Sequence, residues 1–222
     1  MTVLAVGSWK SNAEMIRDAV VPLGYLSDDS VTLDATYKHG RWWSLWRPAD
    51  LTTNDLDPAY GEHHYDFRSL PSHWHGQFDV VTYDPPYKLA GSPRLQLDAD
   101  FGVDRYMPYA ERHALMVDGL IGCAAALRPK GILLAKCADQ ISCGKLHTQS
   151  VTLINAGREA GLDLVDVLHL VGTRTQPRPQ QVHARRNHST MLVFQRRGRQ
   201  ARRPISVQES ALSPGQMSLF DG

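Results

Sequence analysis

One short segment, Asp84-Pro85-Pro86-Tyr87, has residues whose types and order could do chemistry. It directly follows the apolar run Phe78–Tyr83, which predicts a buried strand. Proline has a fixed φ and no backbone N–H, so two prolines predict a stiff turn whose carbonyls are free to face a ligand. A carboxylate, a carbonyl and an aromatic ring together suit a flat group that carries an NH2.

This tetrapeptide resembles the catalytic signature of S-adenosylmethionine-dependent amino-methyltransferases, chiefly the DNA N6-adenine and N4-cytosine enzymes. The resemblance implies that Asp84 and the Pro85 carbonyl accept the two N–H groups of an exocyclic base amine, whose nitrogen then attacks the sulfonium methyl. It also implies that Pro86 stiffens the turn and that Tyr87 stacks on a base flipped out of the duplex. The alternatives are an ordinary turn residue at Asp84 and a core aromatic at Tyr87.

Alternating helices and strands must position this segment, and their pattern predicts one α/β domain. Strands are expected at 31–33, 51–54, 78–83, 132–137, 162–171 and 190–194, and helices at 8–23, 41–46, 110–127 and 148–160, with loops at 88–108 and 138–146. We expect a Rossmann-like, doubly wound methyltransferase sheet, mostly parallel with an antiparallel edge strand. Ligands bind such a sheet at the carboxyl ends of its strands.

A turn after the first predicted strand resembles the family's cofactor-binding motif, Asp-x-Gly-x-Gly or the longer Asp-x-Thr-x-Gly-x-Gly. The segment Asp34-Ala35-Thr36-Tyr37-Lys38-His39-Gly40 departs from it, since Lys38 stands where a glycine is common. The resemblance implies that S-adenosylmethionine is held by Asp34, Thr36, Tyr37 and Gly40, and that Asp84 borders it. Taken alone, the segment could be an ordinary turn.

Other residues match the family's cofactor positions in chain order. Asp55 follows the second strand, where an acid can accept both ribose hydroxyls, although it could also cap a helix. Asp66 and Phe67 match the position that holds the cofactor adenine, and Asp66 could likewise be a cap. Lys10 and Asn12, at the start of the first helix, resemble the motif that contacts the methionine portion of the cofactor.

The length and composition favour one methyltransferase domain at 1–197 and a flexible tail at 198–222. No apolar run reaches the roughly 18 residues that a membrane helix needs, and no secretory signal is evident. Three cysteines, without Cys-x-x-Cys spacing, indicate reduced thiols. We therefore expect a cytoplasmic, nucleoid-associated protein without membrane contact. The histidines at 63, 64, 73 and 75 have no zinc-like spacing, so no metal is expected.

Basic residues are concentrated late in the chain. Residues 167–208 contain nine arginines and no acid, whereas residues 1–166 contain 15 basic and 21 acidic residues. Arginine without lysine favours forked contacts with phosphate and bases, so double-stranded DNA is the expected partner. The candidates for contact with DNA are Arg174, Arg178, Arg185 and Arg186. A solubilising surface is the alternative.

The tail ends in a second motif at 216–220, which resembles the bacterial sliding-clamp-binding pentapeptide Gln-x-x-Leu-Phe. Met217, Leu219 and Phe220 would fill apolar pockets of the clamp, and the Gln216 amide would fix the register. A chance tail, or a tail folded back onto the core, is the alternative.

These features together predict a DNA methyltransferase that moves a methyl group from S-adenosylmethionine to an exocyclic base amine. Aspartate at the first position of Asp84-Pro85-Pro86-Tyr87 favours adenine N6, because the cytosine N4 enzymes more often have serine there. Three alternatives stay open. They are an N4-cytosine DNA methyltransferase, an RNA or protein amide methyltransferase of the same fold, and a non-catalytic module that binds DNA and the clamp.

Overall fold

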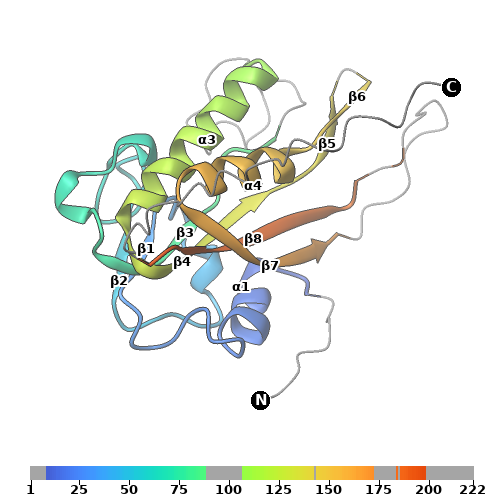
Figure 1. The fold of residues 1–222 in the computed structure, drawn as a ribbon. Helices are drawn as coiled ribbons and strands as arrows, with labels where there is room; N and C mark the ends of the chain where they lie inside the picture. Colours follow the sequence, from blue (N-terminus) through green and yellow to red (C-terminus); the bar gives the residue numbers. More distant parts are fainter. Residues whose placement is uncertain (1–8, 89–106, 143, 173–183, 185, 199–222) are drawn as a thin grey trace, which may run out of the picture.

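A six-stranded sheet forms the centre of the protein. The computed structural model describes residues 9–88, 107–142, 144–172, 184 and 186–198 (Figure 1). The strand order in the sheet is β2-β1-β3-β4-β8-β7. The strands are β1 (Thr32–Asp34), β2 (Leu51–Thr53), β3 (Phe78–Tyr83), β4 (Leu127–Cys137), β7 (Leu162–Val171) and β8 (His188–Arg196).

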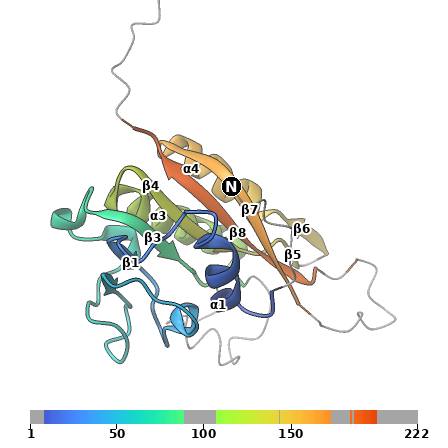
Figure 2. The same cartoon turned by 90° about the horizontal axis from the view of Figure 1, so that it is seen from below.

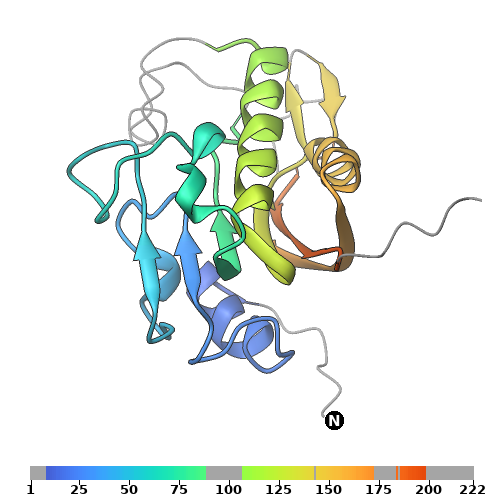
Figure 3. The ribbon, with the colours of Figure 1, turned by 60° about the vertical axis from the view of Figure 1, so that its left-hand side comes forward.

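The direction of the strands follows the predicted pattern. β1, β2, β3 and β4 run parallel, and β1, β2 and β3 are seen side by side in Figure 3. β8 runs antiparallel to both β4 and β7, so the last two strands form an antiparallel pair at one edge. The predicted fold class, a mostly parallel Rossmann-like sheet with an antiparallel edge, is confirmed.

Helices cover both faces of this sheet, with α1 on one face and α3 and α4 on the other (Figures 1 and 2). The α-helices are α1 (Asn12–Met15), α3 (Tyr109–Ala126) and α4 (Gln149–Glu159). The shorter helical turns are the π-helix η1 (Ile16–Val20) and the 3-10 helices η2 (Arg41–Trp43), η3 (Phe67–Ser69) and η4 (Ser72–Trp74).

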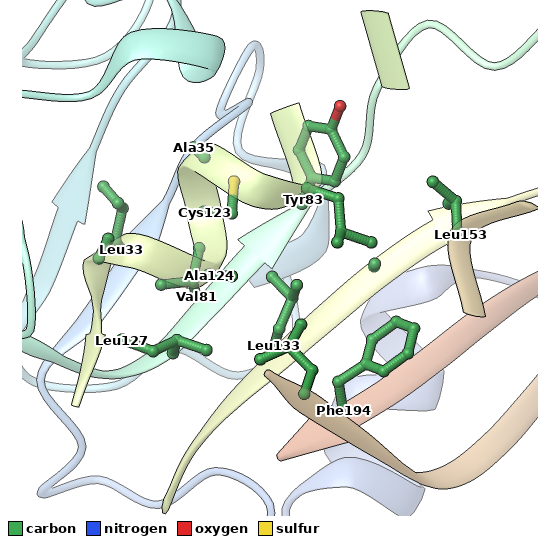
Figure 4. Packing of buried hydrophobic residues seen from close by; sticks show 14 of the residues in the cluster. Leu33, Ala35, Val81, Tyr83, Cys123, Ala124, Leu127, Leu133, Leu153 and Phe194 are labelled. Carbon is green, nitrogen blue, oxygen red and sulfur yellow. The ribbon is translucent and has the colours of Figure 1, made fainter. Parts of the chain in front are cut away.

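Alternate residues of each strand enter two separate cores, as the period of two in a strand requires. Val81 and Leu133 face α3 and α4, where they pack with Leu120 and Phe194 (Figure 4). The neighbouring Val80 and Leu134 face α1 and η1 and belong to the other cluster. This second cluster also contains Trp42 and Trp43, with Tyr37 packed against it, so it lies beneath part of the candidate site.

Three details differ from the predicted elements. The first helix is an α-turn followed by a π-turn and ends at Val20, earlier than the predicted 23. β4 begins at Leu127, earlier than the predicted 132. Its pairing with β3 is interrupted by a bulge around Lys130, whose φ is +68°. Pro129, which has no N–H, therefore lies within the strand at a position that donates no hydrogen bond to β3. The predicted loop at 138–146 contains the hairpin β5 (Gln140–Ser142) and β6 (Lys145–His147).

The first helix begins with a side-chain cap. The Ser11 side chain accepts a hydrogen bond from the Glu14 N–H, which satisfies one of the unpaired donors of α1. Among the described residues, no helix is long and apolar enough to cross a membrane.

Candidate functional site

Asp84 lies directly after the last residue of β3, as predicted. Its backbone N–H donates to Thr36 Oγ1 at 2.8 Å, which joins the turn after β3 to the turn after β1. The indole of Trp42 donates to Asp84 Oδ2 at 3.1 Å. Asp84 Oδ1 is buried and has no hydrogen-bond partner among the described residues. The carboxylate therefore keeps one oxygen with which to accept a ligand N–H.

The protonation of Asp84 depends on opposing effects. Burial raises the pKa of the Asp84 carboxyl above its ordinary value, because a charge is poorly solvated there. The positive charge of Lys136 and the hydrogen bond from Trp42 act in the opposite direction and lower this pKa.

Hydrogen bonds to both proline carbonyls fix the backbone of this turn. The Pro85 carbonyl accepts the N–H of Tyr87 at 2.7 Å, in the i to i+2 pattern of a γ-turn. The Pro86 carbonyl accepts a hydrogen bond from Nη1 of Arg112, a buried side chain of α3, at 3.0 Å. Both proline carbonyls therefore accept a hydrogen bond within the protein, and the prediction that they are free is wrong. A carbonyl has two lone pairs, so Pro85 can still accept one further N–H.

Two glutamines complete the support of this turn. The carbonyl of Tyr87 accepts Nε2 of Gln140 at 2.7 Å and Nε2 of Gln149 at 2.5 Å. Gln149 is fully buried, and its Oε1 accepts the N–H of Ala138 at 3.1 Å. These contacts tie the turn after β3 to the chain after β4 and to the start of α4.

A cavity of about 550 Å³ opens beside this turn. It lies between the start of α1, the turns after β1 and β3, and the adjoining ends of β7 and β8. The predicted site residues that line it are Lys10, Asn12, Thr36, Tyr37, Asp84, Pro85, Tyr87 and Arg186. The structure therefore brings together distant residues, since Lys10 and Arg186 are 176 positions apart in the sequence. A volume of this size is typical of a pocket for one small ligand.

Asp34 ends β1 and is buried behind the cavity, although it does not line it. Its Oδ2 accepts the indole N–H of Trp43 at 2.7 Å, and its Oδ1 accepts the backbone N–H of Thr36 at 3.0 Å. Burial raises the pKa of Asp34 from its ordinary 3.8 to about 7, although both hydrogen bonds oppose this rise. Asp34 thus shapes the turn that carries Thr36.

The backbone shows how Lys38 can stand where the glycine-rich motif has a glycine. Lys38 takes a φ of +47° and Gly40 a φ of +61°, so the lysine adopts the left-handed backbone that a glycine would favour. The carboxylate of Asp55 accepts the Lys38 N–H at 2.8 Å and the Asp57 N–H at 3.0 Å. Asp55 therefore caps local backbone and holds the Lys38 turn. Neither Asp55 nor Gly40 lines the cavity.

Asp66 and Phe67 lie away from the cavity. Asp66 caps η3, where it accepts the Arg68 N–H at 2.9 Å, and it pairs with the Arg68 guanidinium at 2.5 Å. The ring of Phe67 packs edge-on against Tyr83 at 5.3 Å between centroids. The cap directs the carboxylate to its own helix, so the structure does not bring this pair to the other predicted cofactor residues.

Positive charge surrounds the cavity. Arg186 is exposed at the cavity wall. The other predicted DNA-contact residues, Arg174, Arg178 and Arg185, lie outside the described residues. The predicted clamp-binding residues Gln216, Met217, Leu219 and Phe220 also lie outside them. The other lysines and arginines of the wall are Lys10, Lys38, Arg41 and Lys88. Its two acids are Asp84 and Asp139, and Asp139 already accepts hydrogen bonds from Ser150.

Several site residues were not predicted. Trp42 and Trp43 belong to the same hydrophobic cluster as Met15 and Ile16. Their indole N–H groups also bind Asp84 and Asp34, because a buried tryptophan needs an acceptor. Arg112, Gln149 and Lys136 are likewise part of the site. For Lys136, its place within the apolar run 132–137 of β4 was the available signal.

No family model matches this chain, and no curated protein matches it. Solved structures do match. A presumed methyltransferase from Bacillus halodurans is 10% identical and aligns over 80% of this chain and 97% of its own, with a TM-score of 0.51. An S-adenosylmethionine-dependent methyltransferase from Methanosarcina mazei is 10% identical, with 80% and 97% coverage and a TM-score of 0.47.

A presumed DNA modification methylase from Thermus thermophilus, crystallised with S-adenosyl-L-methionine, is 18% identical with a TM-score of 0.41. It aligns with 64% of this chain, which spans 56% of its length. At these identities, structural likeness shows the fold alone. The chain has a Rossmann-like methyltransferase fold, with a half-buried aspartate, Asp84, at the carboxyl end of β3.

Proposed function

We propose that this protein is an S-adenosylmethionine-dependent methyltransferase that acts on an exocyclic base amine in DNA, most specifically adenine N6. The observation that carries the proposal is the state of the Asp84 carboxylate. One of its oxygens is held by Trp42, and the other is buried without a partner among the described residues, at the wall of a cavity. A buried acceptor in this state favours a ligand that supplies an N–H.

The cavity residues fit the proposed cofactor. Lys10 and Asn12 would hold its charged amino-acid end, and Thr36 and Tyr37 would border its adenosine. Asp84 lines the same cavity, and a carboxylate there suits a cation. When bound, the cofactor supplies a methyl group activated by a sulfonium.

The residues of this chain would prepare the amine for attack. Asp84 Oδ1 would accept one amine N–H, and the remaining lone pair of the Pro85 carbonyl would accept the other. Both bonds favour a pyramidal nitrogen with a usable lone pair. Trp42 holds the Asp84 carboxylate and the Tyr87 N–H holds the Pro85 carbonyl, while Arg112 anchors the adjoining Pro86 carbonyl, so alignment and electrostatic preorganisation lower the barrier.

The wall of the cavity supports a polyanionic substrate. Five lysines and arginines border it against two acids, and one of those acids is engaged by Ser150. Tyr87 lies at the wall, where its ring could stack on a base that has left the duplex. A DNA substrate places the enzyme in the cytoplasm with the nucleoid.

Labelled S-adenosylmethionine separates this proposal from the alternatives. The protein is incubated with the cofactor and, in parallel, with double-stranded DNA, RNA or a protein mixture, and the products are digested. We expect label in N6-methyldeoxyadenosine. Label in N4-methyldeoxycytidine would support the cytosine enzyme, and label in RNA or protein alone would refute a DNA enzyme. Failure to bind the cofactor at all would leave a non-catalytic DNA-binding module.

Asp84→Ala tests the carrying observation. We expect transfer to fall at least 100-fold while cofactor binding, measured by calorimetry, changes less than about tenfold, because the lost contact is to the amine. Asp28→Ala, at an exposed carboxylate, is the matched control and keeps wild-type activity. Retained transfer in Asp84→Ala would exclude this mechanism.

We also propose that the segment 216–220 docks the enzyme on a bacterial sliding clamp. Tethering would raise the local enzyme concentration on newly replicated DNA. Deletion of residues 216–220 should abolish binding to purified clamp and spare methylation of short duplexes. Clamp binding that survives the deletion would rule out this role for the tail.

A further inference from the structure

Lys136 is a buried lysine that the proposed reaction does not use. It is the penultimate residue of β4, and only 4% of it is exposed. In the parallel pairing of β3 with β4, Tyr83 is aligned with Ala135, so the next two positions are Asp84 and Lys136. Aligned residues on parallel strands about 4.8 Å apart share one face of the sheet. The lysine is therefore the neighbour of the candidate catalytic carboxylate.

The other neighbours of Lys136 do not offset its positive charge. Across β8 it is aligned with the apolar Met191. Burial raises the pKa of the adjacent Cys137 thiol to about 12, so this thiol is neutral near pH 7. Nζ of Lys136 donates to Oδ1 of Asn12, its hydrogen-bond acceptor within the described part of the chain. An ammonium has three donors, so this single neutral acceptor does not balance it.

Asn12 gives the lysine a second link to the site. It begins α1 and lines the same cavity as Asp84. Lys136 thus lies between an amide that would hold the cofactor and the carboxylate that would hold the amine. Among the described residues, Asp34, from β1, and Lys136, from β4, interact electrostatically with Asp84. The cavity that Asp84 borders is also lined by Lys10, Lys38, Arg41, Lys88, Asp139 and Arg186.

We propose that Lys136 is a positioning residue, which keeps Asp84 ionised and fixes the Asn12 side chain at the cofactor cavity. The role of an ionised Asp84 in accepting the amine rests on the proposed function. Burial disfavours the charge of each group, since it raises the pKa of Asp84 and lowers that of Lys136. Each charge opposes the shift of the other, so loss of either member should move the pKa of the other further from its ordinary value.

Titration of Asp84 tests this inference without any activity. The carboxyl carbon is observed by NMR in protein labelled with 13C-aspartate, and its signal is assigned by its loss in Asp84→Asn. We expect the pKa of Asp84 to rise by about one unit or more in both Lys136→Gln and Lys136→Met. Lys145→Gln, at an exposed lysine, is the control and leaves this pKa unchanged. An unchanged Asp84 pKa in the Lys136 variants would overturn the inference.

The reciprocal experiment covers the case in which the Lys136 variants do not fold. The ε-carbon of Lys136 is titrated in the wild type and in Asp84→Asn. Because coupling between two sites is reciprocal, we expect the pKa of Lys136 to fall in Asp84→Asn by the amount that the lysine lowers that of Asp84. A Lys136 pKa that does not change would equally refute the coupling.

Kinetics then separate the two parts of the role. The acid limb of the pH profile of kcat/KM should move upward with the Asp84 pKa in both variants, whereas a merely structural role would lower the rate equally at every pH. Glutamine keeps an N–H donor for Asn12 and methionine does not, so the cofactor KM should rise at least threefold more in Lys136→Met. Shifted NMR titrations without any methylation would uphold the coupling and count against the proposed function. Equal cofactor KM values would refute the link through Asn12.

Discussion

The stability of this protein should fall between about pH 4 and pH 7 because of one buried acid. Asp34 is 4% exposed, and its pKa is raised from 3.8 to about 7 in the fold. In this window the native state keeps a proton that the unfolded chain has released. The unfolded state then binds fewer protons, so the free energy of unfolding decreases as pH rises.

The size of this effect follows from the two pKa values. The full difference, 7 minus 3.8, is 3.2 units, which corresponds to a loss of about 4 kcal/mol once the pH is above both values. Between pH 5 and pH 8 the expected part of that loss is about 2.5 kcal/mol. Asparagine has the shape of aspartate and no ionisable proton, so Asp34→Asn removes this contribution.

Urea-induced unfolding, followed by tryptophan fluorescence, provides the assay. The free energy of unfolding is measured for the wild type and Asp34→Asn at pH 5, 6, 7 and 8. We expect the wild type to lose about 2.5 kcal/mol relative to Asp34→Asn across this range. Asp28→Asn, at an exposed position, should run parallel to the wild type. Parallel curves for the wild type and Asp34→Asn would refute the reasoning.

Three further substitutions test the backbone and packing of the site by urea-induced unfolding. Lys38→Gly should be about 1 kcal/mol more stable than Lys38→Ala, because both lose the lysine side chain and only alanine is strained at a φ of +47°; equal stabilities would contradict this. Gly119→Ala should lose about 1–3 kcal/mol, since its Cβ would clash with Tyr83 Oη; a neutral effect would mean that Tyr83 moves freely. Arg112→Met should cost about 1–3 kcal/mol and lower kcat, because the Pro86 carbonyl loses its buried donor; unchanged kcat would separate this contact from the reaction.

Most of the fold could be predicted from local patterns. The buried strand β3, the long helix α3 and the late strands β7 and β8 have strong periodicity, and their positions were predicted to within a few residues. The hairpin of β5 and β6 was missed because each strand has only three residues, and Gly144, with a φ of +70°, made the segment resemble a loop. Short strands have too few residues for a period of two to be evident.

The sequence by itself determined where the chemistry lies along the chain. Asp84 was predicted at a strand end because an acid and two prolines follow an apolar run, and Thr36 and Tyr37 were predicted beside it because they follow the first strand. Such information is local, since it depends on neighbouring residues and on the rule that the carboxyl ends of parallel strands meet.

The tertiary structure alone decided which partners hold these groups. Asp66, like Asp84, was predicted at the cofactor, yet it caps its own helix and lies outside the cavity. In the sequence, Trp42 resembles a packing residue and Lys136 a surface charge. Trp42, which is 42 positions before Asp84, donates a hydrogen bond to it. Lys136, which is 52 positions after Asp84, is its charged neighbour. Hydrogen bonds and buried charges depend on distances across the sheet, and only the packed chain sets those distances.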